Sequence, residues 1–177
     1  NNGKLTTALH ANKSYLVHGL SSEKGKVGKA RRYIRNQGLY GEVSVEHWKG
    51  SDLPYTDNLV NLLVVEEDQD ITGSEIMRIL APRGVAYVKQ EEGWHKKVKP
   101  TPEGIDEWTH YLHGPDNNAV ARDTVVGPPK HVQWISGPPH SRSHEFNSSL
   151  GAKVTSGGRI FYIWDEGPIG VVDKRLP

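Results

Sequence analysis

The seven residues from Leu59 to Val65 constrain the fold most, because six of their side chains are apolar and only Asn61 is polar. A strand with apolar residues on both sides is typical of a parallel sheet covered on both faces. A polar loop at residues 49–58 precedes this run, and three acidic residues from Glu66 onward end it. We therefore expect residues 59–65 to form a central parallel strand buried on both faces.

The neighbouring segments alternate between helical and strand patterns. On the amino-terminal side we expect a helix at residues 4–11, a strand at 14–20, a helix at 22–37 and a strand at 42–48. The helix at 22–37 has Ser22 as N-cap, Val27, Ala30 and Ile34 on one face, and Gly38 as its stop. A helix at 72–80 and a strand at 85–88 follow the central run. This order predicts an α/β fold with a doubly wound, Rossmann-like sheet.

The sequence changes character near residue 93. Residues 93–130 are rich in Pro, Gly, His and Asn, with one short helix expected at 103–113. Short apolar runs separated by Gly-Pro and Ser-Gly-Gly turns then predict strands at 132–135, 152–155, 159–164 and 170–172, an antiparallel β module. We expect an α/β domain at 1–92, a linker at 93–130 and β strands at 131–177. The sequence begins without an initiator methionine and ends directly after an apolar, strand-like run, so we expect it to be a piece of a longer protein.

Charge and composition narrow the function classes. The formal net charge is +1, yet residues 1–50 carry nine Lys and Arg against three acids, while residues 51–92 carry three against nine. The basic helix lacks aromatic residues beyond Tyr33, so we expect a solvated surface and no nucleic-acid partner. The absence of cysteine excludes a disulfide scaffold, a thiolate metal site and a cysteine nucleophile. We expect no membrane-spanning segment, because no apolar run approaches about 20 residues.

Ligands of open parallel sheets bind outside the carboxyl ends of the strands. Here those ends carry Gly19 to Ser21, Trp48 to Gly50, and Glu66 with Glu67. Gly3 is either the last glycine of a ligand-cradling turn or a plain turn glycine. Glu66 and Glu67 are candidate catalytic bases, or else solvated carboxylates paired with cations.

Several motifs in the first half carry a family resemblance. They are NGKLT at residues 2–6, LVHGLS at 16–21, the basic helix from residue 24, LPYTDN at 53–58 and EIMRILAPRG at 75–84. Together they resemble class I S-adenosylmethionine-dependent methyltransferases, with the family's first strand missing. The last two motifs at this spacing are the most specific.

The resemblance implies S-adenosylmethionine as cofactor and an unknown methyl acceptor. Gly3 would then lie near the methionine part, residues from Gly19 to Ser21 near the ribose, and Trp48, Lys49 and Gly50 around the adenine, with the two glutamates on the substrate side. Two positions depart from the family pattern. Ser21 stands where a ribose-binding carboxylate is usual, with Glu23 two residues later. Lys49 stands where an aspartate often receives the adenine amino group, and Asp52 is a possible substitute.

The second half carries another resemblance. DEWTHYLHGPDNN at residues 106–118, GPPKHVQW at 127–134 and GRIFYI at 158–163 resemble the lead-in of pyrroloquinoline-quinone-type β-propellers. Large exported proteins of planctomycete-like bacteria join such a propeller to a methyltransferase-like segment. The resemblance implies the start of a propeller and an exported or periplasmic location.

Histidines in the second half raise the question of a metal site. His110 and His113 would share a helix face, with Asp116 following, and His140 and His144 form a weaker pair. We expect packing and hydrogen bonding rather than metal binding. Three functions therefore remain open: a methyltransferase, a non-catalytic binding or scaffold protein with a degenerate Rossmann-like domain, and a quinone- or metal-dependent oxidoreductase.

Overall fold

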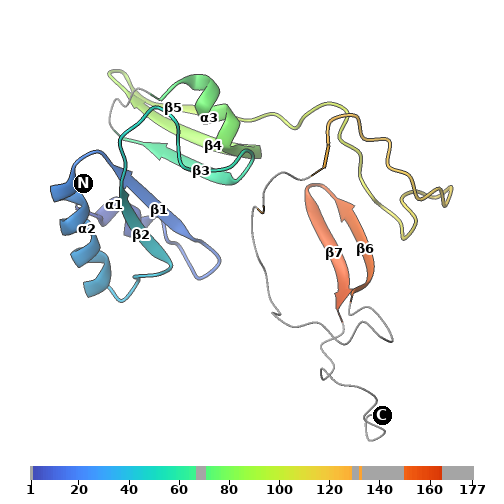
Figure 1. Cartoon of the computed structure of the whole chain (residues 1–177), viewed down its shortest axis with the longest axis horizontal. Coiled ribbons are helices and arrows are strands. Elements are labelled where there is room, and N and C mark those ends of the chain that lie inside the picture. The colour runs from blue at the N-terminus through green and yellow to red at the C-terminus, as the bar shows by residue number, and fades with distance from the viewer. Residues whose placement is uncertain (1, 67–70, 129–131, 133–149, 165–177) are drawn as a thin grey trace, which may run out of the picture. The chain divides into compact units, whose positions relative to one another are not determined.

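The computed structural model describes residues 2–66, 71–128, 132 and 150–164 (Figure 1). The chain divides into two compact units. The first contains residues 1–54 and 68–75, and the second contains residues 55–67 and 76–177. Each unit is described by itself.

The first unit is a parallel β-α-β arrangement preceded by a short helix. Its elements are α1 (Lys4–Ala8), β1 (Val17–Ser21), α2 (Lys24–Asn36) and β2 (Val43–His47). Strands β1 and β2 pair in parallel, from Val17 opposite Val43 to Ser21 opposite His47. This pairing confirms the α/β part of the predicted fold.

Helix α2 covers one face of this strand pair. Its apolar stripe of Val27, Ala30 and Ile34 packs on Val43 and Val45, and all five side chains are buried. The helix ends before Gly38, whose φ of +70° suits a residue without a side chain. The expected N-cap is wrong by one residue, because Glu23 occupies that position and forms no side-chain cap.

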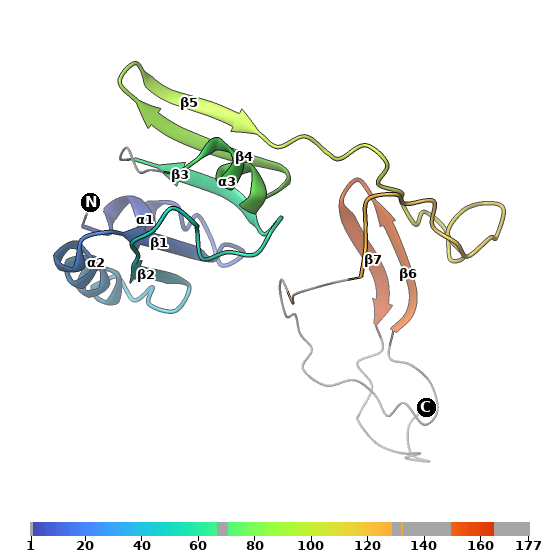
Figure 2. The same ribbon diagram turned by 45° about the horizontal axis from the view of Figure 1, so that its top comes forward.

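The second unit begins with a three-stranded mixed sheet. Its elements are β3 (Val60–Val65), the end of α3 (Gly73–Ile79), β4 (Leu80–Gln90) and β5 (Gly93–Val98). Strands β3 and β4 are parallel, whereas β5 is antiparallel to β4, as Figure 2 shows. Strand β5 was not predicted, since residues 93–98 lie in the expected linker. The segment contains Trp94, His95 and two lysines, and this composition is too polar to indicate a buried strand.

The predicted turn at residues 81–84 is part of β4. Val60 pairs with Leu80 and Leu62 pairs with Val85, so β4 advances five residues where β3 advances two. Gly84 permits this irregularity, because a Cβ there would lie 2.8 Å from the carbonyl oxygen of Val60. The predicted helix before this turn and the predicted strand after it are both confirmed.

Within the described residues, the strands of the α/β part form a two-stranded and a three-stranded sheet. Both sheets contain a parallel strand pair of the predicted α/β fold, and the hydrogen bonds of the described residues do not join them into one sheet. The expectation that the run at 59–65 is buried on both faces is wrong. Val65 is 8% exposed, but Leu62 is 47% exposed on the opposite side of β3. Apolar composition therefore predicted the strand correctly and its burial incorrectly.

The remainder of the second unit holds a hairpin and a long loop. Strands β6 (Leu150–Ser156) and β7 (Arg159–Trp164) pair in antiparallel fashion around Gly157 and Gly158, which confirms two of the predicted strands. The predicted strand at 170–172 lies outside the described residues, as does that at 132–135 apart from Val132.

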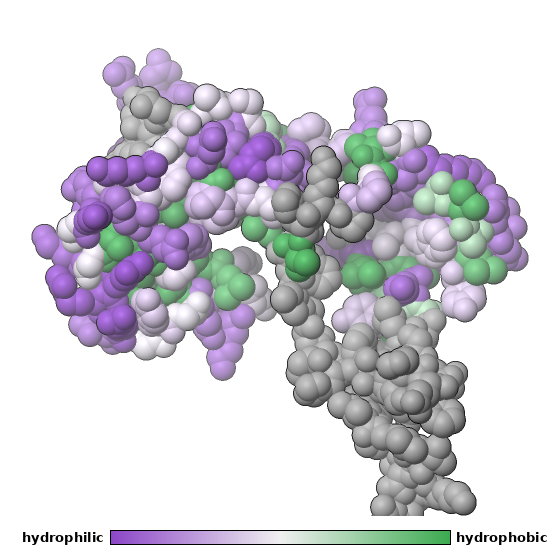
Figure 3. Space-filling model, viewed as in Figure 1, coloured by the Kyte–Doolittle hydropathy of each residue, from purple (hydrophilic) through white to green (hydrophobic). Residues whose placement is uncertain are grey.

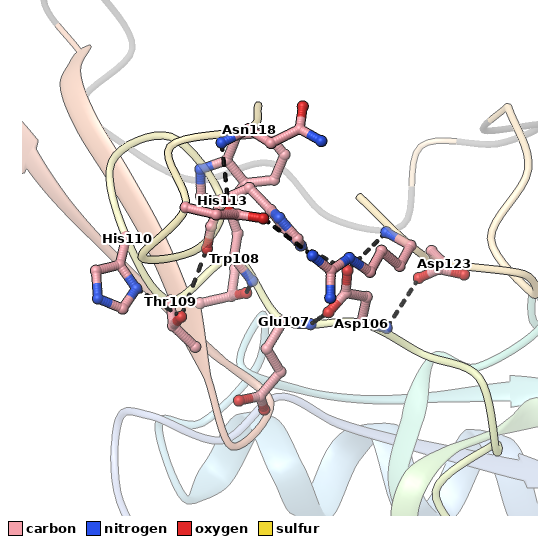
Figure 4. A network of polar contacts seen from close by, with 11 residues as sticks. Asp106, Glu107, Trp108, Thr109, His110, His113, Asn118 and Asp123 are labelled. Atoms are coloured by element: carbon pink, nitrogen blue, oxygen red, sulfur yellow. Dashed lines mark hydrogen bonds and ion pairs between the residues drawn. The ribbon is translucent and has the colours of Figure 1, made fainter. Parts of the chain in front are cut away.

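Residues 103–113 form no helix, contrary to expectation, because side chains hold them in an irregular loop. Asp106, His113 and Asp123 bond to backbone and side chains across residues 104–126 (Figure 4). Trp108 joins the loop to β6: its N–H donates to Oγ1 of Thr155 over 2.7 Å, and its carbonyl accepts the N–H of Thr155 over 2.7 Å. No helix among the described residues is long and apolar enough to cross a membrane.

Candidate functional site

The carboxyl ends of β1 and β2 meet at one edge of the first unit. The N–H of Trp48 donates to the carbonyl oxygen of Ser21 over 3.0 Å, which ties the residue after β2 to the last residue of β1. The structure therefore brings together the predicted ribose-side and adenine-side residues. Parallel strands that end together in this way present their following loops to the same ligand.

The β1 side of this edge consists of Ser21, Ser22 and Glu23. The hydroxyl of Ser21 accepts the N–H of Glu23 over 3.3 Å. The Glu23 carboxylate lies 2.6 Å from Nζ of Lys26, and its side chain is 59% exposed. An exposed ion pair of this kind contributes at most about 1 kcal/mol, so the carboxylate can exchange its partner for a ligand hydroxyl at little cost.

The β2 side of the edge is a compact loop at residues 48–52. The indole Nε1 of Trp48 donates to the carbonyl oxygen of Asp52 over 3.1 Å, and Gly50 lies alongside the ring. Lys49 and Asp52 are both exposed, and the hydroxyl of Ser51 donates to the Asp52 carboxylate over 3.4 Å. The loop thus presents an indole face, a cation and a carboxylate within five residues.

His47 is a polar residue at this edge that the sequence analysis did not select. Its Nε2 lies 3.1 Å from the carbonyl oxygen of Ser22, so it bridges the strand ends. In the sequence, only the position of His47 near the end of a predicted strand could have identified it as a residue of this edge.

Two of the three predicted cofactor glycines, Gly3 and Gly19, have structural reasons to be glycine. Gly3 adopts a φ of +88° at the start of α1, and a Cβ there would lie 3.1 Å from Cα of Ala30. At Gly19 a Cβ would lie 3.2 Å from Thr6 and 3.3 Å from Val45. Both glycines let α1 approach its neighbours closely, and this packing explains them without a ligand.

The two predicted catalytic carboxylates belong to the second unit. Glu66 follows β3 directly and is exposed. Glu67 lies outside the described residues. Their role as bases stays a prediction.

The motif residues between the polar loop and β4 form a structural network. Arg78 donates from Nη1 to the carbonyl oxygen of Tyr55 over 2.8 Å and to the Asp57 carboxylate over 2.7 Å. Nζ of Lys99 donates to Oδ1 of Asn58 and to the carbonyl oxygen of Met77, each over 2.6 Å. These bonds fix the loop before β3 against the end of α3.

The histidines considered as metal ligands do not converge. Buried His113 bonds through Nε2 to Asp106 over 2.6 Å, whereas the Nδ1 of His110 lies 2.9 Å from the hydroxyl of Thr109 (Figure 4). Asp116 instead pairs with Arg122 over 3.0 Å. Within the described residues, no group of three or more His, Cys, Asp or Glu side chains is arranged to hold a metal ion. His140 and His144 lie outside them.

Comparisons with known proteins give structural likenesses at low identity. No protein-family model matches the chain, and no curated protein matches it. Among solved structures, the cyclase SpnF is 22% identical, with a TM-score of 0.44, and the match covers 51% of this chain and 37% of SpnF.

Two further solved structures are named as methyltransferases. A putative S-adenosyl-L-methionine-dependent methyltransferase from Methanococcus maripaludis is 25% identical, with a TM-score of 0.44 and 49% and 42% of the two chains covered. A putative sarcosine dimethylglycine methyltransferase from Galdieria sulphuraria is 18% identical, with a TM-score of 0.44 and 49% and 35% covered. The chain spans less than half the length of each of the three proteins.

Proposed function

We propose that the first unit binds S-adenosylmethionine at the carboxyl edge of β1 and β2. The observation that carries the proposal is the hydrogen bond from Trp48 to Ser21, which joins the two loops that follow adjacent parallel strands. The motifs at residues 53–58 and 75–84, which resemble those of class I methyltransferases, support the same cofactor.

The donors and acceptors at this edge fit an adenosine group. Ribose hydroxyls need acceptors, which the Glu23 carboxylate and the Ser21 hydroxyl supply. The adenine ring needs an apolar wall and an acceptor for its amino group, which the Trp48 indole and the Asp52 carboxylate supply. Lys49 has no acceptor and therefore cannot take the place of the usual aspartate.

Bound S-adenosylmethionine would supply an electrophilic methyl group on a sulfonium. Transfer from such a group depends mainly on how two reactants are positioned. A base is needed only where the acceptor must lose a proton, and Glu66 and Glu67 are the candidates for that role.

Calorimetric titration of the full-length protein with S-adenosylhomocysteine tests the proposal. We expect heat of binding and a rise in melting temperature. Trp48→Ala should weaken binding about tenfold or more, because it removes the adenine wall. Trp94→Ala is the matched control, since this half-exposed tryptophan lies in β5, outside the proposed site.

The outcomes separate the open functions. Absence of heat and of a thermal shift at millimolar ligand would contradict cofactor binding and favour a non-catalytic scaffold. Equal weakening by both tryptophan variants would show that Trp48 acts through stability rather than through contact.

The resemblance of roughly residues 100–177 to a β-propeller leads to a separate proposal, that β6 and β7 belong to a propeller blade. A blade contains four antiparallel strands, of which this hairpin supplies two. Its apolar side chains at Ile160, Phe161 and Ile163 are all about half exposed or more, as expected for a hairpin that needs further strands. Amide exchange of the full-length protein should show protection on the outer edge of β6 or of β7, because at least one of the two would be an inner strand of the blade. Rapid exchange on the outer edges of both strands would contradict a blade.

A further inference from the structure

The outer face of α2 carries cations that have no partner within the described residues. Lys24, Lys29 and Arg32 are exposed, and none forms a hydrogen bond or ion pair with a described residue. The helix contains no acidic residue between Lys24 and Asn36. These three side chains are therefore available to an anionic ligand.

The other cations of α2 are engaged. Lys26 pairs with Glu23 over 2.6 Å, and Nε of Arg31 donates to the carbonyl oxygen of Val45 over 2.8 Å. The guanidinium of Arg35 lies 4.8 Å from the ring centre of Tyr40, where it remains exposed. The structure therefore distinguishes cations that are available to a ligand from cations that contact the protein itself. The sequence alone does not make this distinction.

The geometry of the helix places two of the three free cations away from the core. Val27, Ala30 and Ile34 point toward β2, and at about 3.6 residues per turn Lys29 and Arg32 lie on the opposite side. In Figure 3 the surface over α2 is mostly hydrophilic. From Lys24 to Arg35 the cations extend over about 16 Å of helix.

Two glycines on the same side leave the helix backbone open. A Cβ at Gly25 would meet nothing within 4 Å, and one at Gly28 would meet only the end of Arg32 at 3.9 Å. Neither packing nor a positive φ requires glycine here, although glycine inside a helix costs about 1 kcal/mol relative to alanine. A ligand can therefore approach the helix closely between the cations.

We propose that this outer face of α2 binds the phosphate backbone of a nucleic acid. The face offers no apolar side chain to anchor a protein partner, whereas protein interfaces depend on buried apolar and aromatic anchors. Binding to a phosphate backbone needs only cations, because the release of counterions supplies essentially all of the sequence-independent affinity. The inference is independent of the proposed cofactor site and departs from the expectation from sequence of a merely solvated helix.

The test uses the full-length protein and a fluorescently labelled DNA duplex, with affinity measured from about 50 to 200 mM salt. Each phosphate neutralised contributes about −0.9 to the slope of log affinity against log salt. With three or four cations engaged, we expect a slope of about −3. Lys29→Glu combined with Arg32→Glu should weaken binding at least tenfold and reduce the slope to about −1.

The matched control is Lys96→Glu combined with Lys97→Glu on β5, which changes the net charge equally at two exposed lysines. We expect the control to weaken binding less than about threefold, because these lysines belong to β5 and not to the proposed face of α2. Equal weakening by both pairs would overturn the proposal, as would absence of binding at about 50 mM salt. Lys29→Gln with Arg32→Gln repeats the test without charge reversal, and circular dichroism verifies that each variant is folded.

Binding to vesicles that contain anionic phosphatidylserine, without binding to DNA, would also overturn the proposal. In that case the same face would serve as a membrane-surface contact.

Discussion

The imidazole Nε2 of His113 lies 2.6 Å from Oδ2 of Asp106, and this pair holds the loop at residues 104–126 in place. The same Oδ2 accepts the N–H of Arg122 over 2.6 Å, and Oδ1 accepts the N–H of Glu107 over 2.8 Å. His113 is buried with a φ of +70°, and its ring meets that of Trp108 edge to face at 5.3 Å. One carboxylate therefore fixes a loop that lacks regular secondary structure.

Asp106→Asn should loosen this loop. The amide keeps the size of the side chain but removes its charge and one of its two acceptor oxygens. Either the N–H of Glu107 or both His113 and the N–H of Arg122 then lose their acceptor, and any bond that remains is weaker because its acceptor is no longer charged. We expect faster amide exchange at Arg122, measured by NMR. Asp116→Asn is the control, because its ion pair with the Arg122 side chain is exposed and contributes at most about 1 kcal/mol. Equal effects of the two variants would contradict the central role of Asp106.

Acid should loosen the same loop. The backbone N–H of Arg122, followed by the bond from His113, lowers the pKa of Asp106 below its ordinary 3.8. The N–H groups of Val126 and Val125 lower the pKa of Asp123 in the same way. A carboxyl whose folded pKa is depressed stabilises the fold above its unfolded pKa, and this contribution is lost as pH falls through the folded value.

Amide protection at Arg122 and Val126 should therefore persist at pH 5 and decline below about pH 4. Asp106→Asn should flatten the decline at Arg122. A decline centred near pH 6 would contradict this account.

The helices and strands that could be predicted from the sequence are those whose local residue pattern agrees with the way they pack. Helix α2 was predicted because its apolar stripe and its stop at Gly38 are both local signals. Strand β5 and the loop at 104–126 were missed for the opposite reason. The structure of β5 depends on pairing with β4, and that of the loop depends on side-chain bonds between residues far apart in the sequence, such as Asp106 and Asp123, which are 17 positions apart.

The location of the candidate site could be predicted from the sequence, but the roles of its residues could not. Strand ends at Ser21 and Trp48 follow from the order of elements, and the structure joins them by one hydrogen bond. The roles of Gly3 and Gly19 were not predictable, because their contacts with Ala30 and Thr6 depend on how α1 packs.

Alanine at two glycines should change stability in opposite directions. Gly3→Ala should lower the free energy of unfolding by about 1–2 kcal/mol or more, because a left-handed φ and contact with Ala30 both disfavour a Cβ. Gly25→Ala should raise it by about 0.5–1 kcal/mol, because the residue lies in α2 with open space around it. Urea unfolding followed by circular dichroism measures both. The same sign for both variants would contradict the described packing of α1.

Replacement of Lys99 by methionine should destabilise the second unit. Nζ of Lys99 donates to Asn58 and to the carbonyl of Met77, where it also complements the negative end of α3. Lys99→Met leaves these acceptors without their charged donor, and we expect a loss of about 1–2 kcal/mol in the free energy of unfolding. Lys97→Met is the control, since this exposed lysine two residues earlier lies in β5 and should change stability by less than about 0.5 kcal/mol. Urea unfolding of both variants decides the matter: equal stabilities would show that the lysine does not support the end of α3.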